Sequence, residues 1–482
     1  MLALFMSAVE VTIVATALPQ IVGGLGGFAL YTWVFSGFLL TQTATILVFG
    51  KLADLYGRRP VLIGGMVVFL LGSVLCGFAW SMPALIAFRL LQGLGAGSIQ
   101  PVAITIVGDL YDVSERPRVQ GWLSSVWGFA AIVGPLAGGI IVEALSWRWI
   151  FWINVPVGLC AITGLVLFYD EHVEHRRHAI DYGGTAFFCV GMSALLVALM
   201  QGGVAWPWAS LQTILLAALF AGAFALYFAR ERRAAEPMID FRLWRTPLVA
   251  RVNASALFGG ATIIGVTSFV PIDVQGVLGR SAIVAGFALT AMSIGWPLAS
   301  TFSGRFLRAL DARGTVRLGG ALLFVGTLLL ATMPRTVGPA WIGLASFVIG
   351  FGMGLLNTTF IILIQGSVAW EQRGSATAAN IFSRMLGSTL GAAILGAVLN
   401  AVLHERLGTS NGVAGGIEGI RRIFSTGTDA LSGAQVAALT SALAAGLAHV
   451  FAVLALFGIL ALVATWLVPP RAIFAPSEQR QI

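Results

Sequence analysis

The sequence predicts an all-α integral membrane protein with fourteen transmembrane helices, as judged from its composition, its hydropathy and the spacing of its apolar runs. Hydrophobic residues make up 58% of the 482 residues and charged residues only 10%, and the mean hydropathy is +0.92. A soluble domain has about 25% charged residues, so this chain lacks the polar surface that a protein of this length needs in water. The composition therefore excludes a soluble enzyme or binding domain for nearly the whole chain.

Fourteen apolar runs, separated by Gly, Pro and clusters of charge, set the number of helices. A helix needs about 20 residues to cross a bilayer, and each run is close to that length or longer. The predicted spans are residues 2–23, 30–51, 60–80, 83–110, 118–143, 148–169, 181–202, 209–229, 247–273, 282–307, 316–333, 339–364, 373–403 and 437–468.

The basic residues predict the orientation of these spans. If the N-terminus is cytoplasmic, 20 of the 28 Lys and Arg residues lie in cytoplasmic segments, six lie in outer loops, and Arg89 and Arg384 lie within spans. This bias follows the positive-inside rule and predicts a multi-pass protein with both termini in the cytoplasm. No basic face with interleaved aromatic residues is present, so we expect no nucleic-acid partner.

The chain contains an internal repeat. A shift of 257 residues places Gly95 on Gly352 and Arg116 on Arg373, which matches helices 4–5 with helices 12–13. The shift spans eight helices, so two extra helices are expected between two six-helix halves, an architecture found in transporters. The predicted domains are an N-terminal half at 1–170, two inserted helices with cytoplasmic linkers at 171–246, a C-terminal half at 247–468 and a cytoplasmic tail at 469–482.

The segment GKLADLYGRRP connects predicted helices 2 and 3 on the cytoplasmic side. Gly50 and Gly57 permit a tight connection between closely packed helix ends. Asp54 can accept hydrogen bonds from an arginine or from the amides at a helix N-terminus, and Arg58 holds the loop inside. A plain basic loop would account for the arginines but not for the glycines or Asp54. We therefore predict a cytoplasmic latch formed by Gly50, Asp54, Gly57 and Arg58.

Three charged residues fall deep within predicted spans. Glu10 lies about 15 Å along the first helix, near the centre of the bilayer, where an ionisable group is costly and usually functional. Arg89 in helix 4 needs an acceptor, for which Glu10 and backbone carbonyls are the alternatives. Arg384 in helix 13 has no deep acid in its own half, and it could contact an anionic substrate group or a carbonyl.

Predicted helix 5 contains a proline among glycines. Pro135 removes a backbone donor and bends a helix, while Gly134, Gly138 and Gly139 allow neighbouring helices to approach closely. The combination predicts a hinge or a tight seam, with ordinary packing of small residues as the alternative.

Five segments, in order within residues 10–158, resemble the major facilitator superfamily and its fourteen-helix drug:proton antiporters of the EmrB/QacA type, and the resemblance covers essentially the whole chain, including the two inserted helices. They are EVTIVATALP (Glu10–Pro19), GKLADLYGRRP (Gly50–Pro60), RLLQGLGAG (Arg89–Gly97), GFAAIVGPLAGG (Gly128–Gly139) and WRWIFWINVPVG (Trp147–Gly158). The resemblance implies that Glu10 carries the coupling proton, that Arg89 assists proton transfer or packs against helix 1, and that the helix 5 segment is the antiporter motif. One departure is that the family usually has Asp at the position of Glu10.

The expected function is proton-coupled export of drug-like amphipathic or hydrophobic compounds by alternating access. No Walker-type motif is present, so we do not expect direct use of ATP, and the proton gradient would supply the energy. An enzyme would need clustered His or carboxylates, or a nucleophile with a base, near one membrane face; the sequence shows no such set, so we expect neither an enzyme nor a cofactor. Export of a lipid, siderophore or other metabolite is the alternative on the same fold, and a membrane-embedded enzyme or a receptor is the alternative from another class.

Polar and aromatic residues within the spans are candidates for the substrate cavity. They are Gln42, Trp127, Asn154, Trp296, Asn357, Gln365, Asn380 and Arg384. We expect a monomer in the bacterial inner membrane whose partners are a small-molecule substrate, protons and lipid. The need for a periplasmic adaptor is left open, and no metal site is expected.

Overall fold

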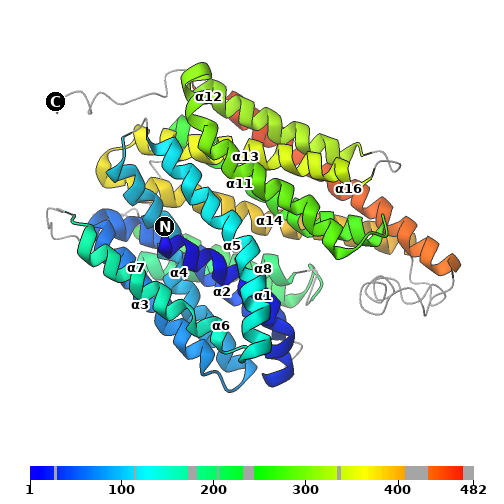
Figure 1. Ribbon diagram of the computed structural model, residues 1–482, viewed down its shortest axis with the longest axis horizontal. Helices are drawn as coiled ribbons and strands as arrows, with labels where there is room; N and C mark the ends of the chain where they lie inside the picture. Colours follow the sequence, from blue (N-terminus) through cyan, green and yellow to red (C-terminus); the bar gives the residue numbers. More distant parts are fainter. Residues whose placement is uncertain are drawn as a thin grey trace. The chain divides into compact units, whose positions relative to one another are not determined.

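Long α-helices make up the described part of the chain (Figure 1). The computed structural model describes residues 1–25, 30–112, 115–171, 182–202, 206–231, 244–333, 338–407 and 433–469. The helices considered below are α1 (Leu2–Leu25), α2 (Tyr31–Tyr56), α3 (Arg58–Gly77), α4 (Met82–Leu110), α5 (Arg116–Ala144), α6 (Trp149–Trp152), α7 (Asn154–Phe168), α8 (Tyr182–Gln201), α9 (Leu211–Glu231), α11 (Pro247–Gly276), α12 (Ala282–Ala331), α13 (Pro339–Ser367), the 3-10 helix η2 (Trp370–Gln372), α14 (Arg373–Leu407) and α16 (Gly433–Trp466).

Each of the fourteen predicted spans coincides with a helical segment, which confirms the predicted fold class. Two of them lie in α12, whose 50 residues include Asp311 with the non-helical φ of 59°. The Asp311 carboxylate accepts a hydrogen bond from Gly314 N at 2.7 Å, so it caps the second part of the helix. The span predicted at 148–169 is divided between α6 and α7 at Ile153.

The described residues group into two compact units. Unit 1 takes in Met1–Ala250 and Phe360–Phe382, and unit 2 takes in Arg251–Thr359 and Ser383–Pro470. The segment Phe360–Phe382 belongs by sequence to the C-terminal half and packs with the N-terminal one. The four domains predicted from the sequence have boundaries that follow the internal repeat and not these two units, and they remain predictions. The tail lies outside the described residues from 470 onward.

Glycines on α4 explain how that helix fits between α2 and α3 in unit 1. Gly93 faces the backbone of Phe38 on α2, while Gly95 faces the backbone of Gly65 and Phe69 on α3. A side chain at either glycine would meet backbone atoms that cannot move aside. The glycines of the RLLQGLGAG segment are therefore required for the close packing of three helices.

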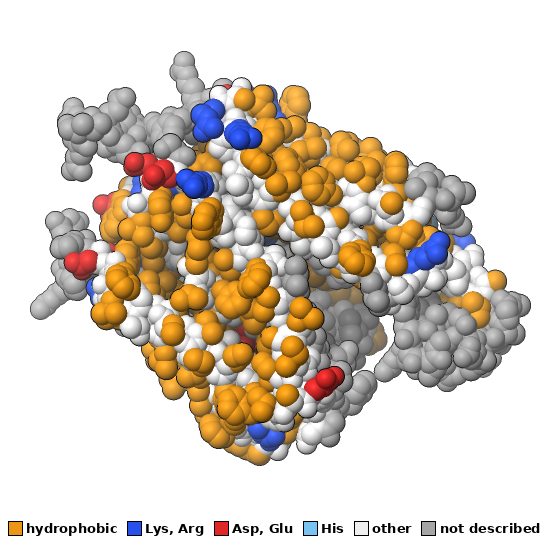
Figure 2. Space-filling model, viewed as in Figure 1, with side chains coloured by type: hydrophobic (Ala, Val, Ile, Leu, Met, Phe, Trp, Pro, Cys, Tyr) orange, Lys and Arg blue, Asp and Glu red, His pale blue; other side chains and the backbone are white. Residues whose placement is uncertain are grey.

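The inserted pair, α8 and α9, belongs to unit 1 and packs onto the rest of it through α8, which contacts α2. Phe188 on α8 is buried, and its ring lies 5.8 Å from those of Phe224 and Tyr227 on α9 and 6.3 Å from that of Phe382 on α14. The opposite face of α9 exposes large apolar side chains, among them Leu215. Hydrophobic side chains are also spread over the described surface seen in Figure 2, with few charged ones between them, as expected for a surface in contact with lipid.

Candidate functional site

Glu10 on α1 and Arg89 on α4 form an ion pair in the interior of unit 1. Both side chains are 0% exposed, and Arg89 Nη1 donates to Glu10 Oε1. The guanidinium also donates through Nε to the carbonyl of Val34 at 3.0 Å and lies 4.3 Å from the centre of the Phe38 ring. Of the two acceptors that the sequence left open for Arg89, the structure provides both, a carboxylate and a carbonyl.

Three neutral side chains surround this pair. Asn154 Nδ2 donates to Glu10 Oε2 and, at 3.0 Å, to Ser73 Oγ. Gln92 Oε1 accepts from Arg89 Nη1 at 2.8 Å, and Gln92 Nε2 donates to Ser73 Oγ at 3.2 Å. We call these five residues the Glu10 cluster. All five are buried, so removal of any one member leaves a polar group without its partner.

The break between α6 and α7 places Asn154 in the cluster. α7 begins at Asn154, directly after the turn at Ile153, and Ser73 Oγ donates to the carbonyl of Phe151 at 2.7 Å. Gly158, one turn further on, allows Leu70 of α3 to pack against α7. The WRWIFWINVPVG segment is thus the sequence that fastens α6 and α7 onto α3.

Ser73 and Gln92 were missed in the sequence analysis. Gln92 lies three residues after Arg89, on the same helix face, and this spacing was the available signal. Ser73 gave none, because a single serine in an apolar helix is common. Asn154, by contrast, was predicted as a cavity residue, and the structure places it on the carboxylate of Glu10.

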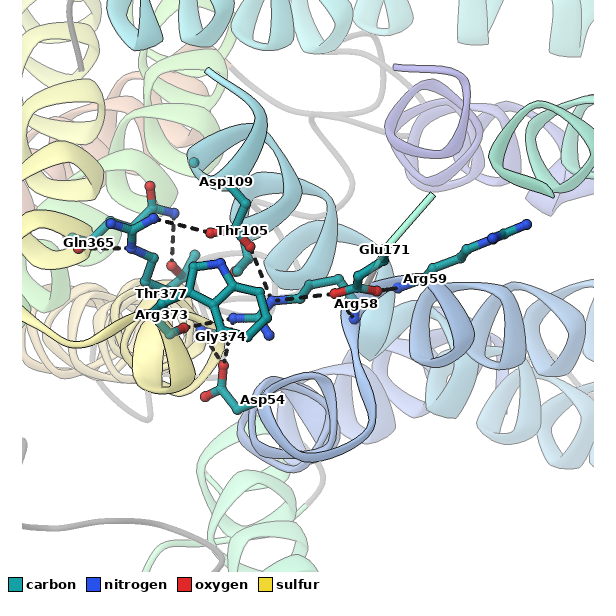
Figure 3. A network of polar contacts seen from close by, with 12 residues as sticks. Asp54, Arg58, Arg59, Thr105, Asp109, Glu171, Gln365, Arg373, Gly374 and Thr377 are labelled. Carbon is teal, nitrogen blue, oxygen red and sulfur yellow. Dashed lines mark hydrogen bonds and ion pairs between the residues drawn. The ribbon is translucent and has the colours of Figure 1, made fainter. Parts of the chain in front are cut away.

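The α2–α3 connection forms a second polar cluster, shown in Figure 3. Asp54 at the end of α2 accepts from Gly374 N at 2.8 Å, Ser375 N at 2.7 Å and Ser375 Oγ at 2.6 Å. These amides belong to the first turn of α14, where a carboxylate is favoured by the helix dipole. Asp54 therefore caps a helix that begins more than 300 residues later in the chain.

Arg58 is the centre of this cluster. Its side chain is 0% exposed, and its Nε lies 3.1 Å from Asp109 Oδ2. Its Nη2 donates to the carbonyl of Trp370 at 2.7 Å, and its guanidinium stacks 3.7 Å from the centre of the Trp370 ring. The weaker contact to Asp54 spans 3.5 Å. We call Asp54, Arg58, Asp109, Trp370 and Ser375 the latch cluster.

Glu171 fixes the backbone at the start of α3. Its two carboxylate oxygens accept from Arg58 N at 2.9 Å and from Arg59 N at 2.7 Å, the free amides of a helix N-terminus. Gly57, which precedes them, has a φ of 93°, a conformation that favours glycine. Glu171 and Trp370 were both missed in the sequence analysis, because their proximity to Arg58 depends on tertiary packing.

The glycines of the predicted latch and hinge have different surroundings. A Cβ at Gly50 would meet Ala378 and the carbonyl of Gly374, so Gly50 lets α2 approach the start of α14. Gly134 faces Thr12 of α1 in the same way, while a Cβ at Gly139 would meet no described atom within 4 Å. Gly138 is buried. Pro135 lies within α5, and its side chain is outside the described residues.

The internal repeat is visible in the hydrogen bonds of two arginines. Arg116 Nη2 donates to the carbonyl of Gly108 at 2.7 Å, and Arg373 Nε donates to the carbonyl of Gln365 at 3.2 Å. Each arginine thus binds the carbonyl eight residues before it, at matching places in the repeat. The Gln365 side chain is fully buried and donates to Thr377 Oγ1 at 3.1 Å, beside the latch cluster (Figure 3).

The remaining cavity candidates are distributed over both units. In unit 1, Gln42 and Asn380 are buried, while Trp127 is 36% exposed. In unit 2, Trp296 is half-buried, and Arg384 Nη1 donates to Asn357 Oδ1 at 2.7 Å. Among the candidates, Arg384 contacts Asn357, whereas Asn154 contacts Glu10 and Gln365 contacts Thr377.

Comparisons with known proteins agree with this architecture. Multidrug resistance protein 3 of Bacillus subtilis is 37% identical over 389 residues, 81% of this chain and 76% of that protein. The multidrug transporter protein MdtP of the same organism is 36% identical over 392 residues, 80% of this chain and 72% of that protein. The human organic anion transporter MFSD10 shares the fold, with a TM-score of 0.61 at 14% identity over 95% of this chain and 97% of that one.

A family description matches most of the chain directly. The Major Facilitator Superfamily model aligns with residues 1–181 and 174–392, which include the Glu10 cluster, the latch cluster and the Arg384–Asn357 pair. The chain therefore belongs to the Major Facilitator Superfamily of membrane transporters.

Proposed function

We propose that this protein is a proton-coupled exporter of drug-like amphipathic or hydrophobic compounds. The buried ion pair between Glu10 and Arg89 is the observation that carries this proposal. A carboxylate in such a place can exchange a proton only when its surroundings change, because its charge is balanced by the adjacent guanidinium. Proton binding at Glu10 is thus linked to a rearrangement of the helices that bear the cluster.

The proposed cycle is alternating access. The substrate enters from the cytoplasm or the inner leaflet, and a proton reaches Glu10 from outside and weakens its hold on Arg89. The latch cluster then breaks and re-forms as the two six-helix halves rock about the substrate. The chain's own groups supply binding and proton exchange, and the proton gradient supplies the energy.

The names of the relatives support drug-like substrates, since one similar Bacillus subtilis protein is named a multidrug resistance protein and another a multidrug transporter. A second candidate is export of an endogenous metabolite. It is favoured by 32% identity over 404 residues to the Acurin A biosynthesis cluster transporter of Aspergillus aculeatus. In both cases we propose a protein of the bacterial inner membrane with both termini cytoplasmic, working as a monomer.

Proton release on substrate binding tests the proposal. We expect Glu10→Gln to fold, because glutamine keeps an oxygen that can accept from Arg89, and to lose both substrate-induced proton release and gradient-driven export. Both are measured in vesicles reconstituted with the purified protein. Glu143→Gln is the matched control, since Glu143 is exposed and outside the cluster. Proton release by Glu10→Gln at the wild-type level would refute the role of Glu10.

A further inference from the structure

Arg384 lies in the first half of α14, and its guanidinium has a single hydrogen-bond partner among the described residues. It stands eleven residues after the start of the helix, about 16 Å along its axis. Its Nη1 donates to Asn357 Oδ1 on α13 at 2.7 Å. A guanidinium has five N–H donors, so most of its capacity is unused.

No carboxylate in the described part of unit 2 compensates this charge. The acids there are Asp273, Asp311 and Glu405, each at or near the end of a helix or at a turn, and none is paired with Arg384. Glu405 is on the same helix, about 31 Å away along its axis. Arg89, the other arginine deep within a span, is neutralised by Glu10. The two deep arginines therefore differ in charge balance.

The backbone that bears Arg384 is held firmly. A Cβ at Gly260 of α11 would collide with the carbonyl of Arg384, and one at Gly387 would collide with the carbonyl of Leu257. Ser388 Oγ donates to the carbonyl of Gly260 at 3.0 Å. α11 and α14 are thus in backbone contact at this position and in the turn that follows it, and Asn357 orients the guanidinium from a third helix.

The side chain remains accessible. Arg384 and Asn357 are both half-buried, and the unused guanidinium nitrogens are not among the buried nitrogens that lack a partner. An oriented, accessible and uncompensated guanidinium within the span of a helix favours a planar anion, which it can bind through two parallel hydrogen bonds. An amide oxygen beside it satisfies one donor without neutralising the charge.

We propose that Arg384 and Asn357 form a binding site for the carboxylate of an amphipathic substrate. The substrates would then carry an apolar body and one acidic group. That the ligand is a substrate rests on the proposed export function, whereas the binding site itself does not.

Equilibrium binding to the purified full-length protein tests the site without a proton gradient. The probes are three dansyl-labelled alkyl chains of equal length that end in a carboxylate, a carboxamide or a quaternary ammonium. We expect the carboxylate to bind about ten-fold more tightly than the carboxamide, which corresponds to about 1.4 kcal/mol, and the ammonium to bind most weakly. Equal affinities for the carboxylate and the carboxamide would overturn the proposal.

Asn357→Asp is the most discriminating variant, because it places a carboxylate of the protein itself in contact with Arg384 and so neutralises the charge of the guanidinium. We expect this variant to fold, to bind the carboxamide like the wild type and to lose the preference for the carboxylate. Arg384→Gln should lose the same preference, whereas Arg308→Gln, at an exposed arginine of α12, should keep it. A carboxylate preference that survives in Asn357→Asp contradicts the proposal.

Lipid is the other source of an anionic group. The binding series is therefore repeated in nanodiscs of phosphatidylcholine, with and without phosphatidylglycerol. We expect the same carboxylate preference in both. A preference that disappears only with phosphatidylglycerol would show that a lipid phosphate occupies the site and would overturn the substrate assignment. Failure of any of these tests leaves proton release by Glu10 unaffected, so the two proposals fail separately.

Discussion

At the scale of single residues, the two oxygens of Glu10 are held by different helices. Oε1 accepts from Arg89 on α4, and Oε2 accepts from Asn154 on α7. An ionised carboxylate satisfies both donors, but a protonated one must donate its own hydrogen. The Asn154 amide would then have to rotate so that its oxygen accepts. Asn154 can thus transmit the protonation state of Glu10 to the start of α7.

Replacement of Asn154 tests this arrangement through stability. Asn154→Leu leaves Glu10 Oε2 without its donor and removes one of the two donors to Ser73 Oγ, and we expect a loss of about 1–3 kcal/mol in the free energy of unfolding. Asn154→Asp should lose more, because it places a second carboxylate beside Glu10. Thermal unfolding of the detergent-purified protein measures both variants. In the Glu10→Gln background, the penalty for Asn154→Leu should shrink, and an equal penalty in both backgrounds would argue against the contact.

The sequence predicted the chemistry of single residues better than their partners. Charged residues are rare within the spans, and this made Glu10 and Arg89 stand out. Asp54 and Arg58 stood out because they lie at the ends of spans, in the connection between predicted helices 2 and 3. The pairing of Glu10 with Arg89 was left open, since depth along a helix does not say which faces meet. Asp109 was not among the predicted latch residues, although it lies 3.1 Å from Arg58.

At the scale of elements, the latch cluster is a helix cap supplied from elsewhere in the chain. Asp54→Asn keeps an oxygen for the amides of Gly374 and Ser375 but removes the charge that favours a helix N-terminus, a change of about 1 kcal/mol. We expect slower turnover with little change in substrate affinity, measured as export rate and equilibrium binding in parallel. Ser375→Ala removes one hydrogen bond and should have a smaller effect. Wild-type turnover in Asp54→Asn would refute the latch.

The inserted pair of helices offers a second test at this scale. Phe188 joins α8 to α9 and to Phe382 on α14. Truncation of a buried Phe costs about 3–5 kcal/mol, so we expect Phe188→Ala to lower the unfolding temperature of the purified protein and to expose the pair to limited proteolysis. Leu215→Ala on the exposed face of α9 is the control and should do neither. Equal proteolysis of the two variants would show that the pair is held by other contacts.

At the scale of the whole molecule, hydropathy gave all fourteen spans but not the continuity of the helices. It could not show that the two spans in α12 are separated by the non-helical residue Asp311, or that another span is broken at Ile153, because hydropathy does not report backbone dihedral angles. It also could not show that Phe360–Phe382 packs with unit 1. The internal repeat predicted two equivalent six-helix halves. The packing of the helix ends depends instead on tertiary contacts, such as those that Asp54 makes.

The predicted orientation can be tested with single cysteines in a background where Cys76, Cys160 and Cys189 are replaced. Asp311 lies at a turn predicted to be cytoplasmic, and Gly338 lies at a loop predicted to be outside; both are exposed. A membrane-impermeant maleimide should label Gly338→Cys in intact cells and Asp311→Cys only in inverted vesicles. The reverse pattern would contradict cytoplasmic termini.

α14 belongs to both compact units, since its residues up to Phe382 group with unit 1 and those from Ser383 group with unit 2. The first turn of α14 is bound by Asp54, and Arg384 lies further along the same helix. Because an α-helix keeps a fixed rise per residue, a displacement of Arg384 must either bend α14 or be transmitted to the hydrogen bonds between Asp54 and the start of that helix. A ligand that moves Arg384 would therefore exert a force on the latch, through the backbone of a single helix.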